Sequence, residues 1–290
     1  MTGYDLCLAP FVEFGFMRRA LVAAVAVALS GGPVGVFLML RRMSLVGDAM
    51  AHAILPGAAL GFLFFGLSLG AMTIGGLAAG FVVIVLAGLV TRNTVLKEDA
   101  SLAAFYLISL AGGVTIVSLK GSNIDLLHVL FGSILAVDDP ALVLLAVIAT
   151  VTLVTLAVIQ RALVAECVDP GFLRSVSRAG APTHLVFLAL VVFNLVGGFQ
   201  ALGTLLAVGM MMAPAIAARF WAREVSGMMA AAALIGVASS VVGLLVSYHA
   251  NLPAGPAIVL VAGGAYVASL FVGVEGGLLW RMMPRGRVAS

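Results

Sequence analysis

Long apolar stretches, separated by short groups of charged residues, glycine or proline, fill almost the whole chain. A transmembrane helix needs about 20 apolar residues to cross the hydrocarbon core, and nine stretches approach or exceed that length. They occupy residues 16–40, 44–66, 68–91, 100–119, 141–160, 185–199, 203–220, 227–248 and 257–280. The pattern predicts an all-α polytopic membrane protein with a single transmembrane domain over residues 1–290.

The number of spans depends on residues 185–220. Two short apolar stretches in this region are divided by the sequence GGFQALG, so one of them is a candidate half-helix or re-entrant segment. Irregular backbone survives at membrane depth only where protein or trapped water satisfies its hydrogen-bonding groups. We therefore expect eight or nine transmembrane helices.

Composition excludes a soluble protein. Hydrophobic residues make up 63% of the 290 residues and charged residues 9%, and the mean hydropathy is +1.24. The net charge of +3 does not indicate a nucleic-acid partner, because the basic residues lie at the ends of the spans and form no basic stripe.

The basic residues indicate the orientation instead, because lysine and arginine accumulate in cytoplasmic loops. With the N-terminus outside and the C-terminus in the cytoplasm, only Arg18, Arg19 and Lys120 lie outside. The twelve cytoplasmic residues are Arg41, Arg42, Arg92, Lys97, Arg161, Arg174, Arg178, Arg219, Arg223, Arg281, Arg285 and Arg287.

Two connections are too long to be simple turns. The outer connection, at about 120–140, has apolar residues at helical spacing and predicts an amphipathic helix along the membrane surface. The inner connection, at 161–185, predicts a short helix that begins near Asp169 and Pro170 and ends near Gly180. A compact cytosolic helix between two spans is suited to docking a soluble partner.

Ionisable side chains inside the membrane are the first place to look for function, because each costs about 3 kcal/mol or more unless it is paired or hydrated. Of the twelve acidic residues and four histidines, only Asp48, His52 and Glu275 fall within a predicted span. We interpret Glu275 as a paired or snorkelling residue, because it lies near the inner end of the last span.

Asp48 and His52 are four positions apart, so on a helix they project from the same face about one turn apart. A carboxylate and an imidazole suit zinc, manganese or ferrous iron. The residues leave an alternative open, in which the pair is an Asp–His hydrogen bond that stabilises packing. In a symmetric dimer, a second pair would complete a four-ligand site on the two-fold axis. Pro56 and Gly57 predict that the helix is interrupted just after the pair.

Asp125 and His128 are three positions apart on the outer amphipathic segment and could receive an ion at the mouth of a path, but a solvated polar face is the favoured interpretation. The chain lacks both the GxxxxGK[ST] motif of a P-loop ATPase and the HExxH motif of a metalloprotease. We therefore expect a protein that is not itself an enzyme.

The sequence LRRMSLVGDAMAHAILPGAALGF at 40–62 resembles the ABC-3 family of metal-import permeases. The resemblance continues through LKEDA at 96–100, DLLHVLFGSILAV at 125–137, DPGFLRSVSRAGAP at 169–182, LGTLLAVGMMMAPAIAAR at 202–219 and NLPAGPAIVLVA at 251–262. It implies a permease fold similar to that of cobalamin and siderophore importers, in the bacterial inner membrane.

The resemblance also implies partners and roles. The partners are cytosolic ATPase subunits, an extracytoplasmic solute-binding protein and a second permease subunit in a homodimer. Asp48 and His52 match the metal ligands of the family, and the helix at 169–182, with Asp169, Arg174 and Gly180, matches the segment that contacts the ATPase. ATP hydrolysed by the partner would drive import of zinc or manganese, or of iron, by alternating access. A proton-coupled secondary transporter and a non-transporting membrane assembly remain the alternatives.

Overall fold

The computed structural model describes residues 8–66, 68–96, 98–119, 134–169 and 180–279. These residues form helices, and none of them lies in a β-strand. The elements are α2 (Ala9–Glu13), α3 (Gly15–Leu40), α4 (Val46–Ala53), α5 (Leu55–Phe65), α6 (Leu69–Asn93), α7 (Glu98–Leu119), the short 3-10 helix η1 (Ile134–Ala136), α9 (Asp139–Val168), α11 (Gly180–Leu202), α12 (Thr204–Ala218), α13 (Val225–Ala250) and α14 (Ala254–Val272).

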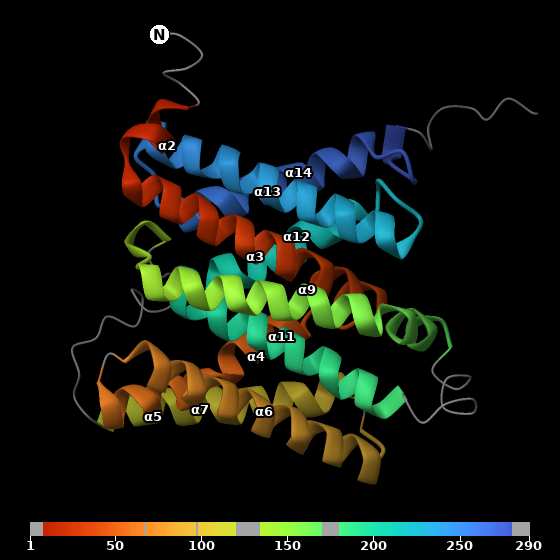
Figure 1. The fold of residues 1–290 in the computed structure, drawn as a ribbon. Coiled ribbons are helices and arrows are strands. Elements are labelled where there is room, and N and C mark those ends of the chain that lie inside the picture. Colours follow the sequence, from red (N-terminus) through yellow and green to blue (C-terminus); the bar gives the residue numbers. More distant parts are fainter. Residues whose placement is uncertain (1–7, 67, 97, 120–133, 170–179, 280–290) are drawn as a thin grey trace, which may run out of the picture.

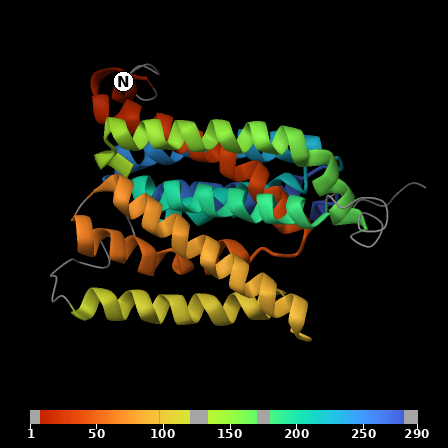
Figure 2. The same cartoon turned by 60° about the horizontal axis from the view of Figure 1, so that its bottom comes forward.

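The helices form two packed groups with α11 between them (Figure 1). One group contains α3, α12, α13 and α14, and the other contains α5, α6 and α7. Helix α11 contacts α3 and α12 on one side and α6 on the other, while α9 packs on α3 and α11. Helix α7 lies at the edge of the bundle in Figure 2. The short helix α4 lies between the groups, where it contacts α7, α11 and α12.

Small residues bring the helices close together, as is usual in membranes, where association depends on packing rather than on burial from water. On α5 and α6, Gly57 and Gly75 approach so closely that a Cβ atom on Gly75 would lie 2.1 Å from the carbonyl oxygen of Gly57. On α3, a Cβ atom on Gly35 would lie 1.9 Å from the carbonyl oxygen of Met211 on α12. Both crossings therefore require glycine.

Seven helical segments in the described part of the chain are long and apolar enough to cross a membrane. Two shorter apolar helices, Ala100–Ile116 and Thr204–Ala218, accompany them. The predicted division of residues 185–220 falls at Gly203, whose φ of 91° is accessible mainly to glycine. At 15 residues, α12 is about 22 Å long and thus shorter than the hydrocarbon core.

Several predicted helix ends are wrong. Helix α9 continues eight residues past the predicted end at 160, and α11 begins at Gly180 rather than near 185. Gly180 is therefore the first described residue of α11, and the short helix predicted after Asp169 falls at 170–179, outside the described residues. At the other end of the chain, α14 stops at Val272, where the predicted span continues to 280.

Candidate metal site

The short helix α4 carries the candidate site, and proline explains why it is short. Pro56 has no N–H group, so it cannot donate a hydrogen bond to the carbonyl of His52 four residues earlier. Helix α4 ends at Ala53, and α5 begins at Leu55. This confirms the predicted interruption just after His52. Asp48 lies in the first turn of α4, where the helix dipole favours an acid.

Asp48 and His52 face each other across one turn, as their spacing predicts. The Asp48 Oδ1 atom lies 3.8 Å from His52 Nε2, which is too far for a hydrogen bond. Metal bonds of about 2.1 Å at cis or tetrahedral angles bring two ligand atoms to about 3.0–3.4 Å. The pair would therefore close by about half an ångström around an ion.

The side chain of Asp48 is exposed, whereas that of His52 is partly buried. Asp48 is the only exposed residue of α4, and its side chain is 65% accessible in the single chain. The side chain of His52 is 28% accessible, and its Nδ1 atom is buried with no hydrogen-bond partner among the described residues. A carboxylate at the surface of an apolar bundle is costly if it faces lipid. Asp48 must instead face water, an ion or another subunit.

Helix α7 holds the region just after His52. The Ser109 hydroxyl donates a hydrogen bond of 2.8 Å to the carbonyl of Ala53. One turn earlier on α7, the centre of the Tyr106 ring lies 6.2 Å from the centre of the His52 ring. In the parts of the chain that the structure describes, no three His, Cys, Asp or Glu side chains form a group that could hold a metal. One copy of α4 therefore offers two candidate ligands, Asp48 and His52.

The other sequence-predicted residues are only partly placed. Asp125, His128 and Arg174 lie outside the described residues, as does most of the outer segment at 120–140. Asp169 caps the C-terminal end of α9. Glu275 lies beyond α14, where its carboxylate pairs with Arg223 and its backbone N–H donates to the Phe220 carbonyl at 2.9 Å. The interpretation of Glu275 as a paired residue is confirmed.

Arg41, Glu166 and His184 form a cluster of ionisable residues that the sequence does not predict. Arg41 has the pattern of an orientation signal, and Glu166 and His184 were predicted to lie in the inner connection, but they lie on α9 and α11. The available signal was the apolar periodicity of AVIQRALVAECV, which continues through Arg161 and keeps Glu166 in the helix.

Comparison with known proteins finds one family model and several metal-transport membrane proteins that are similar to this chain. The family model described as the ABC 3 transport family matches residues 13–273. The manganese import system permease protein ScaB of Streptococcus parasanguinis is 32% identical over 260 residues, which cover 90% of this chain and 91% of ScaB. The chelated iron transport system membrane protein YfeD of Yersinia pestis is 31% identical over 267 residues, 92% of this chain and 88% of YfeD.

A solved structure is also similar. In the complex of PsaBC from Streptococcus pneumoniae with a Fab, one chain superimposes with a TM-score of 0.83 at 30% identity. The match covers 94% of this chain and 98% of that one. The similarity therefore includes nearly every described helix, and not only the region around α4.

Proposed function

This chain belongs to the ABC 3 transport family and is a multi-pass permease subunit of a metal-importing ABC transporter, and we propose that it carries manganese through the site formed by Asp48 and His52. The observation that carries the proposal is the exposure of Asp48. It is the one exposed residue of α4, and its carboxylate lies 3.8 Å from an imidazole nitrogen without a hydrogen bond to it. This geometry favours an ion-binding pair over the packing alternative.

Manganese is proposed first because ScaB, a permease of similar length, imports it according to its name. Carboxylate oxygen and imidazole nitrogen also accept iron and zinc, so these are the competing cargoes. Two protein ligands bind an ion weakly. A second copy of the chain facing the first would supply two more, and we propose a homodimer with the metal path between the two copies of α4.

The proposed topology has nine passes. They comprise the seven long segments and the two shorter helices, α7 and α12. An odd number puts the residues before α3 and after α14 on opposite sides, in agreement with the distribution of basic residues. Residues near Arg41, Glu166 and Arg223 then lie on the cytoplasmic side, and the Arg19–Asp139 ion pair lies outside.

The energy for import is proposed to come from partner ATPase subunits. They would contact the connection at 169–182, with Asp169, Arg174 and Gly180, and drive alternating access. An extracytoplasmic binding protein would deliver the ion near Asp125 and His128. The family match does not favour the alternative of proton-coupled secondary transport.

Uptake of manganese into vesicles that contain the permease, its ATPase and its binding protein tests this function. We expect uptake that stops when ATP is omitted, and that persists when the proton gradient is dissipated. Uptake that follows the proton gradient and ignores ATP would identify a secondary transporter. No manganese, iron or zinc flux under either condition would overturn the transport function.

A further inference from the structure

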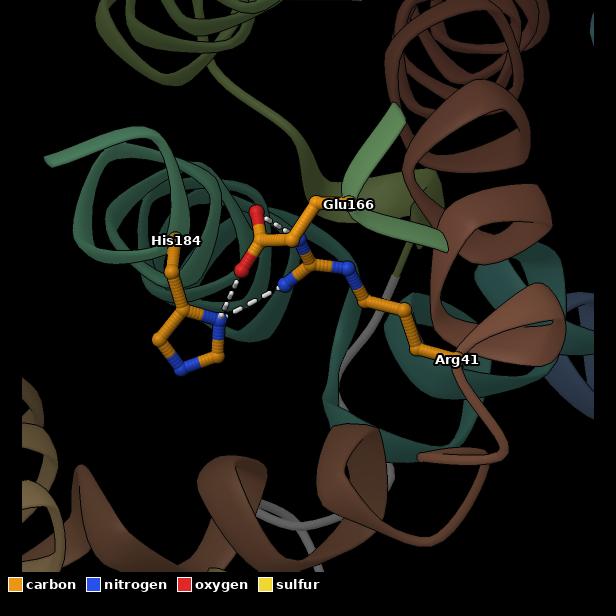
Figure 3. Close-up of polar contacts among 3 residues, drawn as sticks. All are labelled: Arg41, Glu166 and His184. Carbon is orange, nitrogen blue, oxygen red and sulfur yellow. Dashed lines mark hydrogen bonds and ion pairs between the residues drawn. The ribbon is translucent and has the colours of Figure 1, made fainter. Parts of the chain in front are cut away.

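Three helices meet in a cluster of polar side chains at the end of the bundle where α3 stops. Arg41 follows the last residue of α3, Glu166 lies in the last turn of α9, and His184 lies in the first turns of α11. In the Arg41 guanidinium, Nη2 lies 2.5 Å from Glu166 Oε2 and Nη1 lies 2.6 Å from His184 Nδ1 (Figure 3). We call these three residues the Arg41 cluster.

The chemistry of the donors fixes the direction of the hydrogen bonds in this cluster. An arginine side chain donates hydrogen bonds and cannot accept them, so Nδ1 of His184 is the acceptor. The Arg41 guanidinium thus donates both to the Glu166 carboxylate and to His184. Arg41 and Glu166 are 8% and 16% accessible, so each charge depends on the other for compensation.

Aromatic packing holds the guanidinium in place. Its carbon atom lies 4.8 Å from the centre of the Phe187 ring on α11. Phe187 in turn makes an edge contact with Phe37 on α3, at 6.1 Å between ring centres. Helices α3 and α11 are therefore joined twice, once by the rings and once by Arg41 and His184. A lysine could not replace Arg41, because its single ammonium has no planar fork to reach two helices.

The Arg41 cluster also joins the two ends of the connection between α9 and α11. Glu166 is three residues before Asp169, and His184 is four residues after Gly180. The two ends of the connection at 169–180 are thus attached to the same guanidinium.

A short turn connects Arg41 to α4, the helix that carries the candidate metal site. The turn after Arg41 is closed by a hydrogen bond of 2.9 Å from the Met43 N–H to the Leu38 carbonyl. Arg42 in this turn has a φ of 60°, which is unusual for a residue other than glycine. Helix α4 begins at Val46, two residues before Asp48. A shift of Arg41 is therefore carried into α4 by a short, closed turn.

We propose that the Arg41 cluster is a positioning device that transmits movement of the connection at 169–180 to the helix that carries Asp48 and His52. The proposal rests on the proposed function, in which this connection contacts the ATPase. Arg41 does not touch the ion; it sets where α4 lies when the ends of α9 and α11 move. Without the cluster, ATP would be hydrolysed without a matching movement of the metal site.

The test must separate transmission from simple stability. The double variant Arg41→Met/Glu166→Met removes both buried charges together, and such replacements of buried ion pairs by apolar residues usually leave a protein stably folded. The matched control is Arg223→Met/Glu275→Met, which removes an ion pair at the same end of the bundle that does not join α9 to α11. Both are measured in vesicles with the complete transporter.

The readout is the amount of manganese carried per ATP hydrolysed, with manganese affinity and thermal stability measured on the same preparations. For the Arg41 and Glu166 double variant, we expect unchanged affinity and stability but a fall of about tenfold in manganese carried per ATP. Arg41→Lys should show the same fall. His184→Gln, whose amide oxygen can accept from Arg41, should retain more of the wild-type ratio than His184→Leu. The control should match the wild type.

An unchanged ratio in the double variant and in Arg41→Lys would overturn the role of the Arg41 cluster. If the double variant does not fold, the comparison of His184→Gln with His184→Leu tests the proposal instead. Equal amounts of manganese carried per ATP in these two variants would overturn the role of the Arg41 cluster. Failure of the wild type to take up manganese at the expense of ATP would instead overturn the proposed function. The two failures are thereby distinguished.

Discussion

The hydroxyl oxygen of Ser109 on α7 lies 2.8 Å from the carbonyl oxygen of Ala53, at the residue where α4 ends. This hydrogen bond between helices satisfies a backbone group at the interruption that Pro56 creates. It also fixes the residue next to His52. The position of His52 therefore depends on a residue of a neighbouring helix, which offers a test of how firmly the site is held.

Ser109→Ala should weaken this support. We expect a loss of about 1 kcal/mol in stability, the usual value of one hydrogen bond, together with a higher KM for manganese, because His52 is less firmly placed. The control is Thr115→Ala on the same helix, whose hydroxyl donates to the Ala111 carbonyl of its own helix. Thermal unfolding and manganese uptake measure the two effects. Equal KM values for both variants would contradict the role of Ser109.

The crossing of α5 and α6 should not tolerate a methyl group. Gly75→Ala would place its Cβ atom 2.1 Å from the carbonyl oxygen of Gly57, so the two helices must separate. Overpacking of this kind costs about 1–3 kcal/mol. Gly88→Ala on the same helix meets no atom of the described residues within 4 Å and should be neutral or slightly stabilising. Melting temperatures of the two purified variants make the comparison, and similar values would contradict the close approach.

The topology can be checked at two exposed positions on opposite sides of α6. In a background where Cys7 and Cys167 are replaced by serine, a membrane-impermeant thiol reagent should label Ser68→Cys only from outside the cell. It should label Thr94→Cys only from the cytosolic side. Ser68 precedes α6 and Thr94 follows it, and both are exposed. The reverse labelling would invert the proposed orientation.

The sequence predicted the parts of the fold that depend on local physics. Apolar length located the spans, Pro56 predicted the break after His52, and helical periodicity placed Asp48 beside His52. The ends of α9 and α11 were predicted wrongly because charged residues were used to end spans. A helix continues beyond the lipid without difficulty, since its backbone hydrogen bonds are internal.

The Arg41 cluster could not be predicted in this way. Its contacts join residues 125 and 143 positions apart in sequence, and no local pattern links them. A single arginine at the end of a span is the usual signature of the cytoplasmic side. Only the packing of α9 and α11 against the end of α3 shows that this arginine is buried and paired.

We propose that the imported ion is bound by Asp48 and His52. Asp48→Asn keeps the shape of the side chain but removes one negative charge from each subunit of a dimer, at a site where charges are poorly screened. His52→Ala removes the nitrogen ligand. Asp139→Asn is the matched control, because Asp139 is an exposed acid at the opposite end of the bundle from the Arg41 cluster, paired with Arg19 at 3.1 Å.

The measurement is the initial rate of manganese uptake by vesicles that contain each variant with its ATPase and binding protein. We expect Asp48→Asn and His52→Ala to lose uptake while they still assemble with the ATPase, and Asp139→Asn to transport like the wild type. Wild-type rates and unchanged ion selectivity in both Asp48→Asn and His52→Ala would show that the pair only packs α4, and that the metal is bound elsewhere.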